Sequence, residues 1–181
     1  MSVSSPRPDV LSQLGPLRRY ALSLTRNRED AEDLVHDTLL RAIEREDQFR
    51  PGRNLRTWLM SILHNRFVDG LRARRTEAER DAHFARTAIT SMPGGQEDAL
   101  RLAELRRSFE SLPEEQRAAL HLVVVEGLSY EEAAEALAIP QGTLVSRLSR
   151  ARARLRAAEN GEVDTASNVI ALKTRGGPDV S

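Results

Sequence analysis

The segment from Ser129 to Arg156 decides the fold of this 181-residue chain. It begins with Ser129-Tyr-Glu-Glu132, which has the spacing of a capping box, in which each of the two end residues accepts a main-chain N–H of the other at a helix start. The chain then breaks at Ile139-Pro-Gln-Gly-Thr143 and restarts with apolar residues at helical spacing. A short helix, a tight turn and a longer helix are the layout of a helix-turn-helix.

The second helix of this motif has one apolar side, formed by Leu144, Leu148, Ala151 and Leu155 at about 100° per residue. Small hydroxyls and arginines occupy the rest of its circumference, which suits a helix in the major groove of DNA, facing base edges and phosphates. The candidate DNA-contacting residues are Thr143, Ser146, Arg147, Ser149, Arg150 and Arg154. A merely solvated helix usually mixes glutamate with arginine, whereas residues 141–156 hold five arginines and no acid.

The charges of the chain are segregated along its length. There are 27 basic and 27 acidic residues, 26 of the basic ones are arginine, and the formal net charge is zero. Residues 29–47 carry −6, residues 50–75 carry +6, residues 101–135 carry −4 and residues 141–156 carry +5. Because salt screens charges beyond about 10 Å, each basic segment attracts phosphate locally even in a neutral chain. The zero balance therefore does not exclude a nucleic-acid partner.

The sequence lacks the marks of several classes of protein. It has no cysteine, and its four histidines have no metal-ligand spacing, so we expect no metal and no cofactor. A phosphate-binding glycine loop, a nucleophile motif and a catalytic carboxylate–histidine cluster are all missing, so we expect that the chain is not an enzyme. No apolar run approaches the ~18–20 residues that span a bilayer, which predicts a cytoplasmic chain without membrane insertion.

Helical periodicity in the first half predicts an all-α fold. Apolar residues follow helical spacing over 10–24 and 31–42, with Asn27 as the cap of the second helix, and a long helix is expected from about 54 to 75. The run from His121 to Val125 has the composition of a strand, but we predict helix because no partner strand is visible.

Composition changes after this long helix. The chain becomes poor in large apolar residues and contains Pro93-Gly94-Gly95, which indicates a linker. We therefore predict two small helical domains joined by a flexible linker, the second containing the helix-turn-helix. The predicted boundaries are a flexible N-terminus at 1–9, a first domain at 10–75, the linker at 76–98, a second domain at 99–158 and a disordered tail at 159–181.

Taken together, the motifs strongly resemble the extracytoplasmic-function (ECF, group IV) sigma factors of the bacterial sigma-70 family. Gly127 to Arg152 is similar to region 4, Asp30-Ala-Glu-Asp-Leu-Val-His-Asp-Thr-Leu-Leu-Arg-Ala42 to region 2.2, and Phe49 to Arg75 to regions 2.3 and 2.4. The resemblance implies a factor that directs core RNA polymerase to specific promoters and initiates transcription, as a stress- or signal-responsive alternative sigma controlled by an anti-sigma factor. It also implies a cytoplasmic location, with nucleoid association in the holoenzyme.

The resemblance also implies partners and site residues. The partners are the β′ clamp helices and the β flap of core polymerase, promoter DNA in double- and single-stranded form, and an anti-sigma factor. The implied minus-ten residues are Phe49, Arg53, Asn54, Ser61, Asn65 and Arg72. The implied polymerase-docking residues are Asp33, His36, Asp37 and Arg41, with His36 where glutamine is usual. The DNA-contacting residues of the second helix of the motif become minus-35 readers.

The alternative within transcription is a sigma-mimic or helix-turn-helix regulator that sequesters an anti-sigma factor. A mimic has no need of an acid-free arginine helix, so we favour the sigma factor. We expect Trp58 to belong to the core rather than to a stacking platform, since it lies on the apolar stripe of its helix. The acidic segment 101–135 stays unassigned, and we hypothesise that the segregated charge restrains promoter binding by the free chain.

Overall fold

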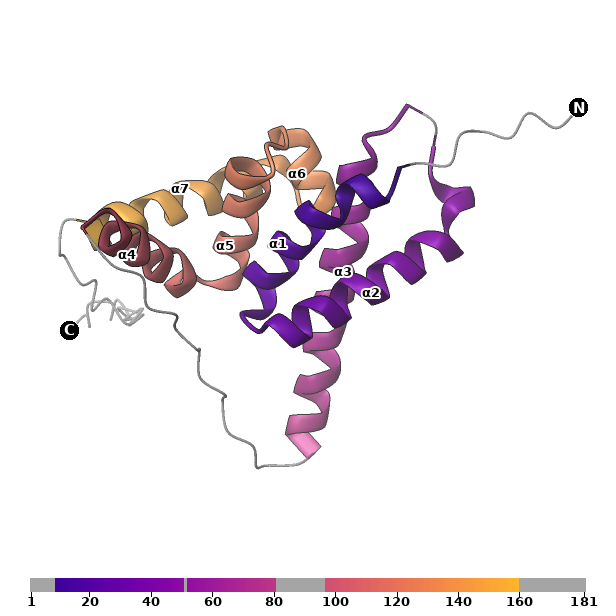
Figure 1. The fold of residues 1–181 in the computed structure, drawn as a ribbon, viewed down its shortest axis with the longest axis horizontal. Helices are drawn as coiled ribbons and strands as arrows, with labels where there is room; N and C mark the ends of the chain where they lie inside the picture. The colour runs from indigo at the N-terminus through magenta and orange to yellow at the C-terminus, as the bar shows by residue number, and fades with distance from the viewer. Residues whose placement is uncertain (1–8, 51, 81–96, 160–181) are drawn as a thin grey trace, which may run out of the picture.

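The computed structural model describes residues 9–50, 52–80 and 97–159, and within these ranges it contains helices and no strand (Figure 1). The prediction of an all-α fold is confirmed. The elements in chain order are η1 (Leu11–Gln13), α1 (Leu14–Thr25), α2 (Arg28–Glu44), η2 (Glu46–Gln48), α3 (Leu55–Arg80), α4 (Glu97–Ser111), α5 (Glu114–Leu120), η3 (His121–Val125), α6 (Tyr130–Ala136) and α7 (Gln141–Glu159).

The first three α-helices form one unit, with α1 packed on both α2 and α3. Asn27 caps α2 as predicted, because its side-chain oxygen accepts the N–H groups of Glu29 at 2.8 Å and Asp30 at 3.2 Å. Of the apolar stripe expected on α3, Leu59 and Leu63 are fully buried. Trp58 is only partly buried and packs at the edge of the core, so the expectation of a core tryptophan is met in part.

The helix-turn-helix is formed by α6 and α7. The capping box is present, with the Ser129 N–H donating to Glu132 Oε2 at 2.9 Å and the Glu132 N–H donating to Ser129 Oγ at 3.2 Å. The turn passes through Ala138 at φ +52°, a left-handed conformation that is unusual for a residue with a Cβ. Leu144, Leu148 and Ala151 of α7 are buried, as its apolar stripe predicts.

The run His121–Val125 is helical, as predicted, but it forms a π-helical turn, η3, rather than a continuation of the α-helix. The Glu126 N–H reaches back to the His121 carbonyl at 3.0 Å, a longer loop than an α-helix makes. This wide turn carries the chain out of α5 and toward the start of α6 (Figure 1).

The two units pack directly on each other. The contacts join α1 to α5 and the start of α3 to α6, and the apolar core is continuous across the boundary (Figure 1). The rest of α3 projects away from this junction and continues to Arg80, five residues past the predicted end at 75. Residues 81–96 of the predicted linker, residues 1–8 of the predicted N-terminus and residues 160–181 of the predicted tail lie outside the described residues.

Candidate nucleic-acid interface

The first candidate surface is the turn that leads into α3. Gly52 adopts φ +91°, a conformation that favours glycine, and Asn54 then caps α3 by accepting the Arg56 N–H at 3.0 Å. Upstream of this turn, the Phe49 ring lies against Trp58 with 5.1 Å between centroids. The structure thus places three of the implied minus-ten residues, Phe49, Arg53 and Asn54, around the start of one helix.

A hollow of about 170 Å³ opens on the neighbouring side of α3. Ser61 and Asn65 both line it, so the structure brings together two of the implied minus-ten residues. Arg41 from α2, an implied docking residue, lines the same hollow. Arg72 does not; its guanidinium lies 3.7 Å from Asp69 one turn back. The hollow has polar, aromatic and cationic walls, which suit capture of an unstacked base.

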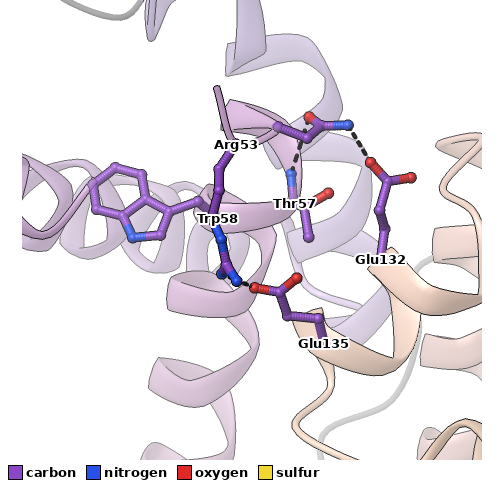
Figure 2. Close-up of a pocket in the computed structure, with 6 residues that line it drawn as sticks. Arg53, Thr57, Trp58, Glu132 and Glu135 are labelled. Atoms are coloured by element: carbon purple, nitrogen blue, oxygen red, sulfur yellow. Dashed lines mark hydrogen bonds and ion pairs between the residues drawn. The ribbon is translucent and has the colours of Figure 1, made fainter. Parts of the chain in front are cut away.

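Two glutamates of α6 reach the start of α3 (Figure 2). The Arg53 guanidinium pairs with Glu135. The Asn54 amide donates to Glu132 Oε1 at 2.6 Å. Hydrogen bonds from the Ser129 main chain and from Asn54 outweigh partial burial and lower the pKa of Glu132, which stays ionised. Residues implied in minus-ten recognition are therefore in contact with the helix-turn-helix.

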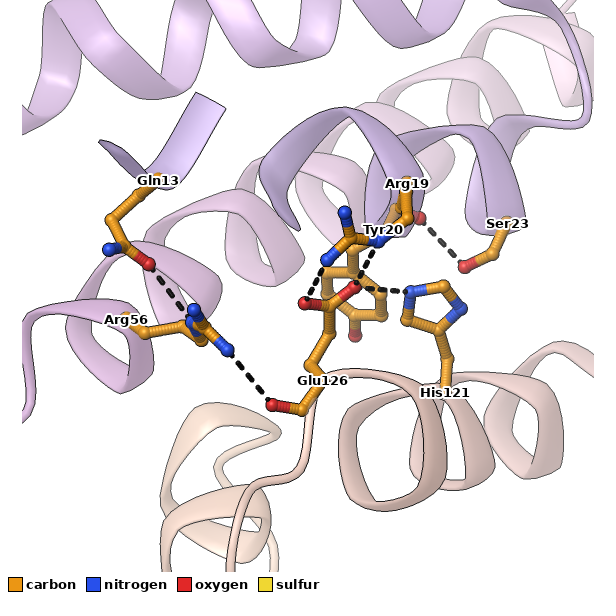
Figure 3. A network of polar contacts seen from close by, with 7 residues as sticks. All are labelled: Gln13, Arg19, Tyr20, Ser23, Arg56, His121 and Glu126. Carbon is orange, nitrogen blue, oxygen red and sulfur yellow. Dashed lines mark hydrogen bonds and ion pairs between the residues drawn. The ribbon is translucent and has the colours of Figure 1, made fainter. Parts of the chain in front are cut away.

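A second polar network crosses the same boundary (Figure 3). Arg19 of α1 forms a bidentate pair with Glu126, with Nε–Oε1 at 3.1 Å and Nη2–Oε2 at 3.0 Å. Arg56 donates to the Glu126 carbonyl at 3.1 Å and to Gln13 Oε1 at 2.9 Å. Burial alone would raise the pKa of Glu126, but hydrogen bonds from His121 and Arg19 bring it below its usual value. The carboxylate is buried in its charged form.

Tyr20 lies at the centre of the boundary and is fully buried. Its hydroxyl hydrogen-bonds His64 Nδ1 at 3.0 Å, and its ring lies over His121 with 5.3 Å between centroids. Burial raises the pKa of Tyr20 far above its usual value. Burial, with the positive charge of Arg147 as a second cause, lowers the pKa of His64 to about 4. Tyr20 and His64 are therefore both uncharged at neutral pH.

On α7, the implied minus-35 residues do not share one environment. Thr143, Ser149, Arg150 and Arg154 are exposed, as a DNA-facing surface requires, and Ser146 is partly buried. The Arg147 side chain is only 19% exposed, and its guanidinium pairs with Glu115 of α5 at 3.0 Å. Arg147 is thus held by Glu115 in this arrangement, whereas Arg150 is exposed and makes no ion pair within the part of the chain that the structure describes.

The implied polymerase-docking residues Asp33, His36, Asp37 and Arg41 are all exposed on α2. Asp37 pairs with Arg66 of α3 at 2.7 Å. Leu40 and Ile43, which were not predicted as docking residues, are 49% and 69% exposed on the same helix. Their signal was available, because both lie off the apolar stripe of α2. An apolar and charged face of this kind is typical of protein docking.

Four residues that make contacts across the boundary were also not predicted. Arg19 and Arg117 carried no motif, Glu126 belonged to an unassigned acidic segment, and Glu132 had a sufficient explanation in its capping box. No cluster of metal-ligating side chains occurs among the described residues. Within those residues, no helix is both long and apolar enough to cross a membrane.

Comparison with known proteins identifies the family of the chain. The family model for sigma-70 region 2 matches residues 10–77, and the model for sigma-70 region 4 matches residues 102–155. The ECF RNA polymerase sigma factor EcfG of Rhodopseudomonas palustris is 45% identical over 154 residues, covering 84% of each chain.

Solved structures show the same similarity. The sigma factor RpoE of Bartonella quintana, in complex with the anti-sigma factor NepR, matches with a TM-score of 0.71 and 38% identity, covering 86% of this chain and 95% of that one. CnrH, in complex with the cytosolic domain of CnrY, matches with a TM-score of 0.60 and 27% identity, covering 84% and 86% of the two chains.

Proposed function

This chain belongs to the ECF family of RNA polymerase sigma factors, which are transcription factors rather than enzymes. On this basis we propose which partner each of its three candidate surfaces binds. We propose that the α3 turn and hollow bind the melted minus-ten strand, that α7 reads the minus-35 element in the major groove, and that α2 docks on core polymerase. The observation that carries the proposal is the hollow on α3 lined by Ser61 and Asn65, in a chain of this family.

The minus-ten role rests on the geometry of α3. A basic turn at Arg53 and Asn54 leads to a hollow lined by Ser61 and Asn65, with the Phe49 ring tilted against Trp58 beside it. Capture of single-stranded DNA needs a cationic track for phosphates and a shaped polar and aromatic pocket for a base. These elements lie within four turns of one helix.

The minus-35 role rests on the exposed face of α7, where Arg150 makes no ion pair among the described residues. A forked guanidinium matches the O6 and N7 acceptors of guanine. The polymerase role rests on α2, where Leu40 and Ile43 add exposed apolar area between charged residues. We assign the β′ clamp helices to α2 and the β flap to the second unit.

An anti-sigma factor is the remaining partner. NepR is bound by a sigma factor, and the cytosolic domain of CnrY by CnrH, and this chain resembles both binding proteins over more than four fifths of its length. We propose that a partner of the NepR kind holds this chain inactive and that its release frees the chain for polymerase.

Reconstituted transcription tests the function. Core polymerase with the purified chain transcribes a template library in which random promoter sequences lie between fixed flanks, and the transcripts are sequenced. We expect start sites that share two elements about two helical turns apart, absent with core alone. A product pattern identical to that of core polymerase alone would overturn the proposal. Addition of purified NepR from Bartonella quintana tests the regulatory part, since unchanged transcription would point to a different kind of partner.

A further inference from the structure

The end of the acidic segment 101–135, which runs into α6 of the helix-turn-helix, faces the first unit. Glu126, Glu132 and Glu135 each contact a residue between Arg19 and Arg56 on the other side of the boundary. The Arg53 and Asn54 contacts join side chains that are 82 and 78 positions distant along the chain. The unassigned acidic segment therefore has a partner within the same molecule.

We infer that α6 occupies the minus-ten turn in place of DNA: the carboxylates of Glu132 and Glu135 take the positions at Arg53 and Asn54 that promoter phosphates would take. This inference rests on the proposed minus-ten role of that turn. A carboxylate and a phosphate offer a guanidinium and an amide the same kind of anionic oxygen acceptor. The two occupants compete, because the carboxylates already take the donor groups of Arg53 and Asn54 that the phosphates would need.

The contact is built to be reversible. The Arg53 and Glu135 side chains are 56% and 47% exposed, so water screens their pairing, and exposed pairs contribute little individually. Because both side chains are partly in solvent, Arg53 and Glu135 can separate and pair with other groups while the apolar core stays packed. Arg19 and Glu126 add a stronger anchor, because the Glu126 side chain is fully buried.

The same arrangement holds a residue of the minus-35 helix. Arg147 is paired with Glu115 and is close enough to His64 on α3 to lower its pKa. The packed form of the chain thus restrains one residue on each DNA-binding surface. A chain that binds DNA only when these side chains are released has an apparent affinity reduced by the fraction in which they are released.

A charge-matched pair of variants separates this contact from a general change in charge. E132Q/E135Q removes both carboxylates, and glutamine at position 132 still completes a capping box. The control E104Q/E131Q removes two charges from exposed positions that make no ion pair among the described residues. The probe is the labelled non-template strand of a minus-ten element enriched in the transcription assay, and binding to the free full chain is measured by anisotropy.

We expect E132Q/E135Q to bind this strand about three- to tenfold more tightly than wild type, and the control to change binding by less than about twofold. Equal affinities of E132Q/E135Q and its control would overturn the inference. Holoenzyme transcription separates the two proposals: if every variant transcribes but free-chain affinities are equal, only the inference fails, and if wild type does not transcribe, the proposed function fails.

A second measurement follows the packing without DNA. The chain has no native cysteine, so A73C/A153C places two dyes at exposed positions on α3 and α7. We expect E135R to lower energy transfer between the dyes, because it sets two cations against each other, and R53E/E135R to restore it. Unchanged transfer in E135R, or a failure of the second charge reversal to restore it, would overturn the inference.

Discussion

Arg117 of α5 donates from Nε to the main-chain carbonyl of Ser23 in α1 at 2.6 Å. The last carbonyls of an α-helix have no N–H partner within the helix, so an arginine from the second unit completes a helix of the first. Arg117 also donates to the Leu112 carbonyl at 2.7 Å and is 2% exposed. Burial, with the charge of Arg26 as a second cause, lowers its pKa to about 10, so it is charged at neutral pH.

Replacing Arg117 with methionine should destabilise the chain. The substitution keeps the unbranched stem but leaves the partly buried Ser23 carbonyl and the buried Leu112 carbonyl without this donor, and such a loss costs about 1–3 kcal/mol per group. We expect urea unfolding, followed by circular dichroism, to show a loss of about 2–4 kcal/mol. Arg107→Met, at an exposed position on α4, is the control. Similar losses in both variants would contradict the capping role of Arg117.

Stability should fall in mild acid because of His64. Its pKa in the folded chain is about 4 against 6.5 for the free side chain, so the unfolded chain binds the proton first as pH falls. Above pH 6.5, His64 is neutral in the folded and the unfolded chain, and the free energy of unfolding is at its full value. As pH falls from 6.5 to 4, that free energy decreases by up to about 3 kcal/mol. Unfolding of wild type and His64→Asn at several pH values checks this. As pH falls, the free energy of unfolding should decrease more in wild type than in the variant. A constant difference between the two would exclude His64 as the cause.

Replacing Ala138 with glycine should stabilise the helix-turn-helix. Ala138 lies in the turn between α6 and α7. From Tyr130 to Glu159, all of which the structure describes, it is the only residue at positive φ, and a Cβ is strained there. We expect a gain of about 0.5–1 kcal/mol in urea unfolding, after the larger chain entropy of glycine is included. Ala153→Gly on the exposed side of α7 should instead cost about 1 kcal/mol. A loss of stability in Ala138→Gly would show that the turn tolerates its alanine.

Arg150 and Arg156 should differ in how they affect promoters. If Arg150 reads a base edge, Arg150→Ala should reduce transcription from an intact minus-35 element by about 1–3 kcal/mol, and should reduce it less when that element is scrambled. Arg156 is an exposed arginine of α7 outside the set of candidate base-reading residues. Arg156→Ala should weaken both templates alike, as the loss of a phosphate contact does. Run-off transcription with the four combinations measures this. An equal effect of Arg150→Ala on both templates would remove it from the base-reading set.

Asn65 should act after polymerase binding. Its side chain is exposed at the hollow on α3 and is not one of the implied docking residues of α2, so Asn65→Ala should leave the affinity for core polymerase unchanged. We expect open-complex formation, followed by permanganate reactivity of unpaired thymines, to fall by about tenfold, the effect of one lost hydrogen bond to a base. Ser61→Ala, one turn away in the same hollow, is the companion variant. Equal losses of polymerase binding and opening would indicate a folding defect.

Local chemistry explains what could be predicted. The Asn27 cap, the Ser129–Glu132 box and the apolar side of α7 each depend on residues within about one turn of one another, and all three occur as expected. The end of α3 was placed too early, at 75, because the fading apolar stripe marked the end of packing rather than the end of the helix. The π-helical geometry at His121–Val125 was beyond prediction, because it depends on where Glu126 is anchored.

The sequence by itself determined the helices, the helix-turn-helix, the segregated charges and the family, since each depends on residues that are neighbours along the chain. Only the tertiary structure decided which charges meet. It paired Glu135 with Arg53, Glu126 with Arg19 and Glu115 with Arg147, from segments that share no local pattern. The physical reason is that a charge attracts every opposite charge within a Debye length, so its partner is chosen by the packing of the apolar core that brings two helices together.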